Sequence, residues 1–396
     1  MDKFGKYIGN ELKYIKRYLD TETPENKNYP WVQKFEEKFL AVSGSKYAIA
    51  VNSATSGLHA ALKACDLKPG DEVISPGLTV IMNALVTVES NLTPVFADIN
   101  PNTWNIDIDS IKPVVTEKTR VIMPVSLFGL PLDIEPIIEF AKERNIIVID
   151  DSAETIMGKY KDSFAGSHAD MAVYSFENKK HMTSGGEGGM VITSNEDLAT
   201  RVRKYAGIGY GNLTATAGRV SLASSEFQNP LYKRHDTSGL NYRMTPLTAC
   251  VGLAQLERID ELVDRRIMIS DMFHKAVEGC SWMIPQKRIS EANHTYLTAG
   301  FKFLGEEQKS TTWKEFYNSY VSDGGDGFYS AWMNPYLENV FYKKKIGNTI
   351  CDNGLCPNAE DLQKKLMLFK TNYRNIDVAS KKAEILSNLI DRIGRK

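Results

Sequence analysis

The sequence contains few cysteines and no long hydrophobic run. Its 396 residues include only 5 cysteines, and Cys351 and Cys356 in CDNGLC are too widely spaced for a CxxC pair. We therefore expect free thiols rather than disulfides or a metal site. No apolar run approaches the roughly 18 residues of a membrane span, and the N-terminus lacks the apolar segment of a signal peptide. These absences predict a soluble, cytoplasmic protein.

The chain also lacks an excess of charge of either sign. Its 48 Lys and Arg residues balance 49 Asp and Glu residues, which gives a formal net charge of -1. No global basic field attracts nucleic acid, and no acidic excess indicates disorder. The chain exceeds the roughly 100–200 residues of a typical domain, and 42% of its residues are hydrophobic. We expect two domains, whose partners are small molecules or other copies of the chain rather than nucleic acid or a membrane.

Short apolar runs rich in valine and isoleucine predict buried strands. They are residues 47–53, 71–76, 94–99, 119–125, 145–151, 170–176 and 188–194. Helical stretches such as 56–65 and 134–145 lie between several of these runs, which is the spacing of crossover helices in a mostly parallel sheet. The predicted fold class is α/β.

The pattern changes after about residue 245. Long helical patterns cover residues 247–279 and 361–393, around less regular, aromatic-rich sequence. Within that sequence, SDGGDGFYSAWMNPY (322–336) is more typical of a tight turn beside a packed aromatic cluster than of a lid. We expect an N-terminal segment (1–28), a large domain (29–260) and a smaller C-terminal α+β domain (261–396).

Two polar motifs follow predicted strands, where ligands bind in open α/β sheets. VNSATSGLHAAL passes from a strand into a helix, so that Thr55 and Ser56 can cap it, and its free N–H groups suit a phosphate. IVIDDSAET ends a buried strand in Asp150 and Asp151, either of which could hold a cationic ring nitrogen. Each motif alone is also typical of an ordinary cap or turn.

A third motif, YSFENKKHMTSGGEGGMV (174–191), places Lys179, Lys180 and His181 side by side before a glycine-rich stretch. A lysine at a strand end can form a Schiff base with an aldehyde. The phosphate turn, the strand-end aspartate and this lysine are the three groups that pyridoxal phosphate requires, for its phosphate, its pyridine nitrogen and its aldehyde. Their occurrence in this order predicts that cofactor.

Several motifs in order resemble those of the DegT/DnrJ/EryC1/StrS family of sugar aminotransferases. They are FEEKFLAVSGSKYAIAVNSATSGLHAAL, LFGLPLDIEPI, VIDDSAE, SFENKKHMTSGGEGGMV, GLNYRMTPLTACVGLAQLERID and CPNAEDLQ. The resemblance runs from about residue 30 to the C-terminus. It implies an aspartate-aminotransferase-like fold (fold type I), with a mostly parallel seven-stranded sheet in the large domain, and a homodimer with active sites between subunits.

The resemblance also implies an activity. Members of this family move an amino group, usually from L-glutamate, to the keto carbon of a nucleotide-linked sugar. For this chain we expect a nucleotide-linked 4-keto-6-deoxyhexose as the acceptor. The product would serve polysaccharide or glycoconjugate synthesis, such as that of lipopolysaccharide.

Roles for individual residues follow from the same resemblance. Asp151 would pair with the pyridine nitrogen, and Glu154 would approach the ring hydroxyl. Lys180 would hold the cofactor and move the proton during transfer.

The phosphate of the cofactor would be bound from two subunits. The resemblance assigns Thr55, Ser56 and Ser175 to one side of the phosphate. Asn241 and Arg243 of GLNYRM would close that site from the partner subunit.

The sequence departs from the family pattern at three places. Val80 stands where an aromatic residue often stacks on the cofactor ring, so the packing there is expected to be aliphatic. Ser126 stands where histidine is common, which leaves one contact with the sugar open. The third departure is an extra glycine, Gly185 or Gly186, between the lysine and EGG.

The extra glycine allows two assignments of the reactive position. Counting forward from SF selects Lys180, whereas counting backward from EGG selects His181. A histidine there resembles the sugar 3-dehydratase branch, which uses the same fold and cofactor without a covalent lysine. Forward counting preserves more matches, so we assign Lys180. A catalytically silent nucleotide-sugar-binding relative is a further alternative, although binding alone would require neither Lys180 nor Asp151.

Overall fold

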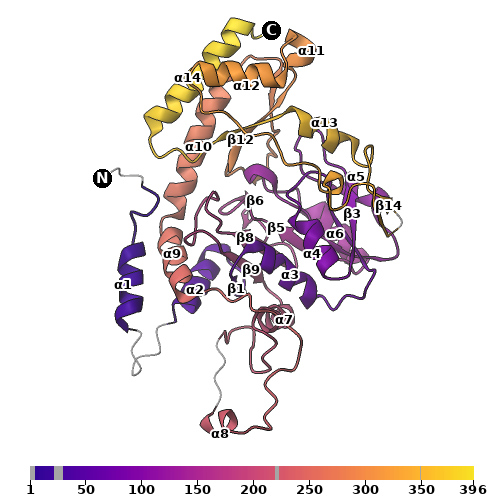
Figure 1. Cartoon of the computed structure of the whole chain (residues 1–396), viewed down its shortest axis with the longest axis vertical. Coiled ribbons are helices and arrows are strands. Elements are labelled where there is room, and N and C mark those ends of the chain that lie inside the picture. The colour runs from indigo at the N-terminus through magenta and orange to yellow at the C-terminus, as the bar shows by residue number, and fades with distance from the viewer. Residues whose placement is uncertain (1–4, 22–29, 219–222, 348) are drawn as a thin grey trace.

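A seven-stranded sheet forms the centre of the computed structural model, which describes residues 5–21, 30–218, 223–347 and 349–396 (Figure 1). Its order is β1-β9-β8-β5-β4-β2-β3. Neighbouring strands are parallel from β8 to β3, whereas β9 runs antiparallel to β1 and β8. The strands are β1 (Tyr47–Val51), β2 (Glu72–Pro76), β3 (Thr93–Ala97), β4 (Thr119–Ile122), β5 (Ile147–Asp151), β8 (Met171–Ser175) and β9 (Gly189–Thr193). All seven predicted strands and the α/β fold class are confirmed.

Helices cover both faces of this sheet because its strands are apolar on both faces. In β1, Ala48 and Ala50 belong to one buried cluster, whereas Ile49 and Val51 belong to another. This alternation is the two-residue period of a strand. The first cluster includes side chains of α2 (Trp31–Ser43) and α9 (Pro246–Leu256), and the second includes those of α3 (Ala54–Ala64) and α7 (Glu196–Ala206). Further crossover helices are α4 (Met82–Glu89) and α6 (Glu135–Glu143).

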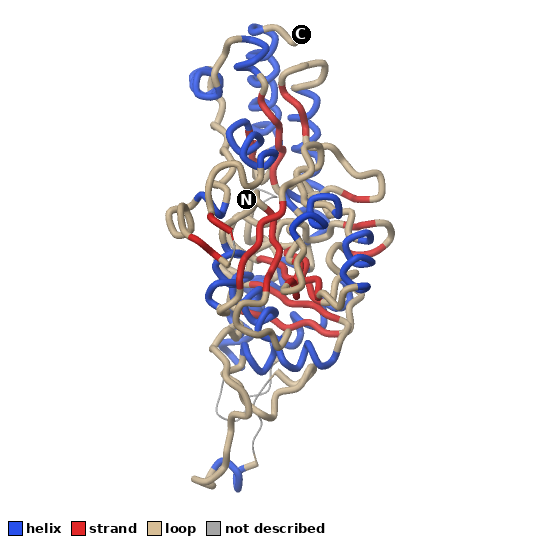
Figure 2. The backbone as a smooth tube through the Cα atoms, turned by 90° about the vertical axis from the view of Figure 1, so that its right-hand side faces the viewer, coloured by secondary structure: helices blue, strands red, loops and turns tan. Residues whose placement is uncertain are grey.

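A second, antiparallel sheet lies with several helices at one end of the molecule (Figures 1 and 2). It has the order β10-β12-β15. The elements here are α10 (Ile259–Ala276), β10 (Met283–Pro285), β12 (Thr298–Phe303), α12 (Trp313–Ser322), β15 (Leu366–Lys370) and α14 (Ile376–Ile393). Their apolar side chains form a core cluster of their own.

The two long helical patterns predicted from the sequence are interrupted. The first divides into α9 and α10 around residues 257–258, and the second contains β15 between α13 (Pro357–Lys365) and α14. Residues 366–369 are all buried, and β15 pairs along its length with β12. Pairing with a strand more than 60 residues away therefore overrides the local helical pattern, so the helical interpretation of residues 366–370 was wrong.

The change from one core to the other occurs along α10. Ile259 and Val263 pack in the cluster of the large sheet, whereas Ile269 and Phe273 pack in that of the second sheet. We propose that the domain boundary expected near residue 260 lies in this helix. The boundary expected between residues 28 and 29 lies outside the described residues.

The remaining elements are short, apart from the 11-residue helix α1. Figure 1 shows α8 at the tip of a long excursion of the chain between α7 and α9. None of the described helices combines the length and apolar character that a membrane span requires. The remaining helices and strands are α1 (Glu11–Thr21), α5 (Ile108–Ile111), η1 (Lys112–Val114), η2 (Leu127–Gly129), β6 (Lys159–Tyr160), β7 (Ser163–Phe164), α8 (Ser224–Phe227), β11 (Ala292–Asn293), α11 (Gly305–Lys309), η3 (Pro335–Leu337), β13 (Lys345–Ile346) and β14 (Thr349–Ile350).

Candidate active site

A cavity of about 620 Å³ lies beside the carboxyl ends of β5 and β8. Ligands of open α/β sheets bind at this edge. Some of its lining residues lie at or after the ends of strands of the large sheet, and others follow α9 in the chain. The lining residues include Ser53, Thr55, Val80, Asp151, Glu154, Ser175, Lys179, Lys180, Arg266, Leu297, Tyr329 and Trp332.

The N-terminus of α3 forms part of the cavity wall. Ser53 caps this helix, because its hydroxyl accepts from the Ser56 N–H at 3.1 Å and the Ser56 hydroxyl accepts from the Ser53 N–H at 3.2 Å. The N-cap residue is therefore Ser53 rather than Thr55 or Ser56, and Ser56 contributes to the capping box from the third position of the helix. Thr55 is exposed in the cavity wall, whereas Ser56 is buried behind it. The turn presents the positive end of an 11-residue helix to the cavity.

The two aspartates at the end of β5 point in different directions, as neighbours in a strand do. Asp151 lines the cavity and accepts a hydrogen bond from the Ala153 N–H at 3.2 Å. Asp150 is buried outside the cavity wall and accepts from the Ser152 hydroxyl at 3.0 Å. Burial raises the pKa of Asp151 to about 6 and that of Asp150 to about 7. A cationic group in the cavity would stabilise the ionised form of Asp151, so this position fits a protonated ring nitrogen.

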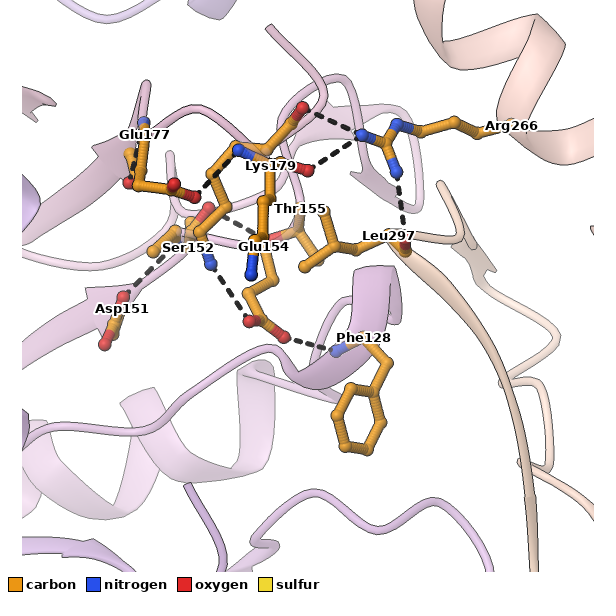
Figure 3. A network of polar contacts seen from close by, with 12 residues as sticks. Phe128, Asp151, Ser152, Glu154, Thr155, Glu177, Lys179, Arg266 and Leu297 are labelled. Carbon is orange, nitrogen blue, oxygen red and sulfur yellow. Dashed lines mark hydrogen bonds and ion pairs between the residues drawn. The ribbon is translucent and has the colours of Figure 1, made fainter. Parts of the chain in front are cut away.

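The Lys180 amine lies in the cavity against the Glu154 carboxylate. Nζ of Lys180 is 3.0 Å from one oxygen of Glu154, and the other oxygen accepts from the Phe128 N–H at 2.9 Å (Figure 3). The Lys180 side chain is only 17% exposed, and that of Glu154 only 5%. The site therefore holds a lysine in a fixed place among acids, which fits a cofactor with an aldehyde and a ring hydroxyl.

Neither chain neighbour of Lys180 is enclosed in the cavity, although Lys179 lies at its edge. The side chain of His181 is buried outside the cavity wall, with Nε2 3.0 Å from the Thr295 carbonyl oxygen. Burial holds the pKa of His181 well below its ordinary value, so the imidazole is neutral. Lys179 is exposed, and its amine lies 5.9 Å from the centre of the Tyr329 ring. Of these three side chains, that of Lys180 is the one enclosed in the cavity.

The extra glycine lies in a turn that does not form part of the cavity wall. Gly185 and Gly186 have φ values of 97° and 139°, a backbone conformation that other residues rarely adopt. Gly188 and Gly189 are required by close packing instead. A Cβ on Gly188 would overlap the Ser184 hydroxyl oxygen, and a Cβ on Gly189 would lie 2.8 Å from the backbone of Ser53. A turn of this conformation suits an inserted glycine, as the forward count to Lys180 requires.

The other predicted site residues divide into two groups. Ser175 lines the cavity at the end of β8, and Val80 supplies the aliphatic wall that was expected. Asn241 and Arg243 are exposed and lie outside the cavity of their own chain, although Arg243 pairs with Val51 at the end of β1. The structure thus brings Thr55, Asp151, Glu154, Ser175 and Lys180 together, and leaves Ser56, Asn241 and Arg243 outside the cavity.

Several cavity residues were missed by reasoning from the sequence. In the segment interpreted as a packed turn, Phe328 is indeed buried, but Tyr329 and Trp332 line the cavity. Tyr329 is 60% exposed, and Trp332 stacks on Phe128 with a ring separation of 5.9 Å. Arg266 was also missed. The signal for the aromatic pair was a glycine-rich turn followed by aromatic residues, whereas nothing in the helical pattern of α10 distinguished Arg266.

Comparison with known proteins identifies relatives over most of the chain. The sequence profile of the DegT/DnrJ/EryC1/StrS aminotransferase family matches residues 7–368. A GDP-perosamine synthase from Escherichia coli O157:H7 is 36% identical over 291 residues, which cover 73% of each chain. The spore coat polysaccharide biosynthesis protein SpsC of Bacillus subtilis is 33% identical over 338 residues, which cover 85% of this chain and 84% of that one.

Solved structures share the fold along nearly the whole chain. An aminotransferase from Psychrobacter cryohalolentis has a TM-score of 0.87 and 27% identity, with 98% of each chain covered. A GDP-4-keto-6-deoxymannose-3-dehydratase has a TM-score of 0.81 and 24% identity, with 95% of this chain and 97% of that one covered. At that identity the second likeness concerns the fold alone.

The raised pKa of Asp150 predicts how stability depends on pH. Between about pH 4, where an unfolded aspartate titrates, and about pH 7, the folded chain binds the extra proton, so this group makes stability fall as the pH rises. Asp150→Asn should remove that contribution. Relative to the parent, the free energy of unfolding of the cofactor-free variant should rise from pH 4.5 to 7.5, by up to about 1.4 kcal/mol per pH unit, and its thermal midpoint should rise with it. The exposed control Asp264→Asn should show no such trend, and equal profiles for both variants would contradict the assignment.

Proposed function

Because the chain belongs to the DegT/DnrJ/EryC1/StrS aminotransferase family and is a pyridoxal-phosphate-dependent sugar aminotransferase, we propose that it moves an amino group from L-glutamate to a nucleotide-linked 4-keto-6-deoxysugar. The similarity to a GDP-perosamine synthase supports a sugar acceptor of this class. The similarity to a polysaccharide biosynthesis protein supports a role in polysaccharide synthesis, and we propose lipopolysaccharide as the product served. The free cysteines support a reducing compartment, the cytoplasm.

The observation that carries this proposal is the enclosed Lys180 amine between acids that suit the cofactor. When bound, pyridoxal phosphate supplies an electron sink that stabilises negative charge on the α-carbon of the amino donor. Asp151 would hold the protonated ring nitrogen, and Glu154 would face the ring hydroxyl. Lys180 would carry the cofactor covalently. Once the amino group of the donor displaces it, the freed Nζ would take the proton from the α-carbon of the donor.

The phosphate would bind at the N-terminus of α3. Thr55 and Ser175 line the cavity there, and Ser56 contributes through the capping box that fixes the turn. Asn241 and Arg243 do not line the cavity of their own chain, and their exposure suits contact with a second copy. We therefore propose a homodimer in which each subunit supplies these two residues to the phosphate site of the other.

The position of His181 favours amino transfer over sugar dehydration. A dehydratase that replaces the lysine with a histidine needs that imidazole at the cofactor. Here His181 is buried against the Thr295 carbonyl and Lys180 occupies the cavity. A protein that only binds a nucleotide sugar would need neither Lys180 nor Asp151 in the cavity.

Transfer of isotopic nitrogen tests the proposed reaction. With L-[¹⁵N]glutamate and a panel of nucleotide-linked keto-sugars, mass spectrometry should find ¹⁵N in the sugar product of a 4-keto-6-deoxysugar. Asp151→Asn should lower this turnover about 100-fold or more, because the ring nitrogen loses its charged partner, whereas Asp150→Asn should retain most of it. A deoxygenated sugar without nitrogen would contradict the proposal and favour the dehydratase.

Mixed dimers test the shared site. Lys180→Ala and Arg243→Ala should each be inactive alone. When the two are co-expressed with different tags, half of the dimers should be mixed and one of their two sites intact, which restores about a quarter of the parental activity. Absence of any recovery in purified mixed dimers would show that Arg243 does not serve the partner's site.

A further inference from the structure

The backbone and the side chain of Lys180 are joined by a closed ring of hydrogen bonds. From the side chain, the ring passes through the Glu154 carboxylate to the Phe128 N–H, and the Phe128 carbonyl accepts from the Leu297 N–H at 2.9 Å. From the backbone, the Lys180 carbonyl accepts from Arg266 at 2.8 Å, and Arg266 also donates to the Leu297 carbonyl at 2.9 Å. The segment between β8 and β9, residues 176–188, carries Lys180 and is called the lysine loop below. Figure 3 shows Glu154, Phe128, Leu297 and Arg266 around it.

Arg266 is a buried cation bound by neutral groups. It is 5% exposed, and within the described part of the chain no carboxylate lies at salt-bridge distance from it. Its guanidinium donates to the carbonyls of Lys179, Lys180 and Leu297 and to the Thr371 hydroxyl, at 2.8–3.0 Å. Burial lowers its pKa to about 10, so it is charged at neutral pH.

Burying a charge without a counterion costs free energy of folding. We therefore attribute the role of Arg266 to the geometry of its hydrogen bonds. A planar guanidinium presents several donors in fixed directions, which a lysine ammonium does not. Here one guanidinium joins the lysine loop to the segments that precede β12 and follow β15. Arg266 itself comes from α10, the helix that links the two cores.

We propose that Arg266 is a positioning residue, which fixes the backbone at Lys179 and Lys180 and thereby holds the Lys180 amine at Glu154. The inference rests on the proposed function of Lys180. Without Arg266, three carbonyls and a hydroxyl lose their donor, and the lysine loop is no longer tied to the C-terminal part of the chain. A displacement of about 1 Å at a reacting group can lower the rate about 100-fold.

The reactivity of the Lys180 amine in the cofactor-free protein tests this inference directly. An amine held against a carboxylate is hindered from attacking an acylating reagent. With acetic anhydride and peptide mass spectrometry, Arg266→Met should raise the labelling rate of Lys180 about threefold or more relative to the exposed Lys142. Arg266→Lys should show an intermediate rate, since lysine keeps the positive charge but lacks the planar guanidinium and its fixed donor directions.

Arg265 provides a matched control on the same helix. It donates to the carbonyls of Tyr373 and Arg374 and is not part of the ring. Arg265→Met should therefore leave the labelling of Lys180 unchanged. In the holoenzyme, Arg266→Lys should lower kcat about tenfold or more and change the KM for L-glutamate less than about threefold.

Two outcomes would overturn the inference. Unchanged labelling of Lys180 in a folded Arg266 variant would show that the ring does not hold the amine. A raised KM for L-glutamate with unchanged labelling would show that Arg266 contacts the ligand directly. If Arg266→Met does not fold, the labelling of Arg266→Lys decides. Failure of the proposed function would appear separately, as amino transfer that persists in Lys180→Ala.

Discussion

The buried ion pair between Lys180 and Glu154 is the contact on which the candidate site depends. Glu154 lies just after β5 and Lys180 just after β8, and these two strands are parallel neighbours in the sheet. Because the carboxyl ends of parallel neighbours meet at one edge, the strand order brings the two side chains together. Removing one partner of such a pair leaves an uncompensated buried charge, at a cost of about 3–5 kcal/mol.

Two further contacts restrain that pair, and the N-terminus of a helix completes the cavity around it. The Phe128 N–H binds the second oxygen of Glu154, the capped N-terminus of α3 forms the phosphate-suited wall, and Arg266 holds the lysine loop from the C-terminal side. The cavity therefore has walls from segments that are far apart in the sequence. The activity that we propose needs this arrangement, because general acid–base catalysis requires the catalytic group to lie within hydrogen-bond reach of the proton that it transfers.

Much of this site could be predicted from the sequence, because its signals are local. Asp151 follows a buried apolar run, and Lys180 stands at a fixed spacing from the next one, so the motif order alone indicated the cofactor. The errors arose where structure depends on distant partners. Strand β15 forms because it pairs with β12, and Arg266 contributes by binding carbonyls more than 80 residues away. Neither contact leaves a periodic or compositional trace in the sequence.

The most direct test of this account is to locate the covalent bond between protein and cofactor. Borohydride reduction of the holoenzyme, followed by peptide mass spectrometry, should place the cofactor mass on Lys180 in ENKKHMTS. Lys179→Ala should leave that labelling intact, whereas Lys180→Ala should abolish it. Cofactor mass on Lys179 would contradict the assignment. Labelling of neither lysine, together with a sugar dehydration that His181→Ala abolishes, would show that the chain is a dehydratase instead.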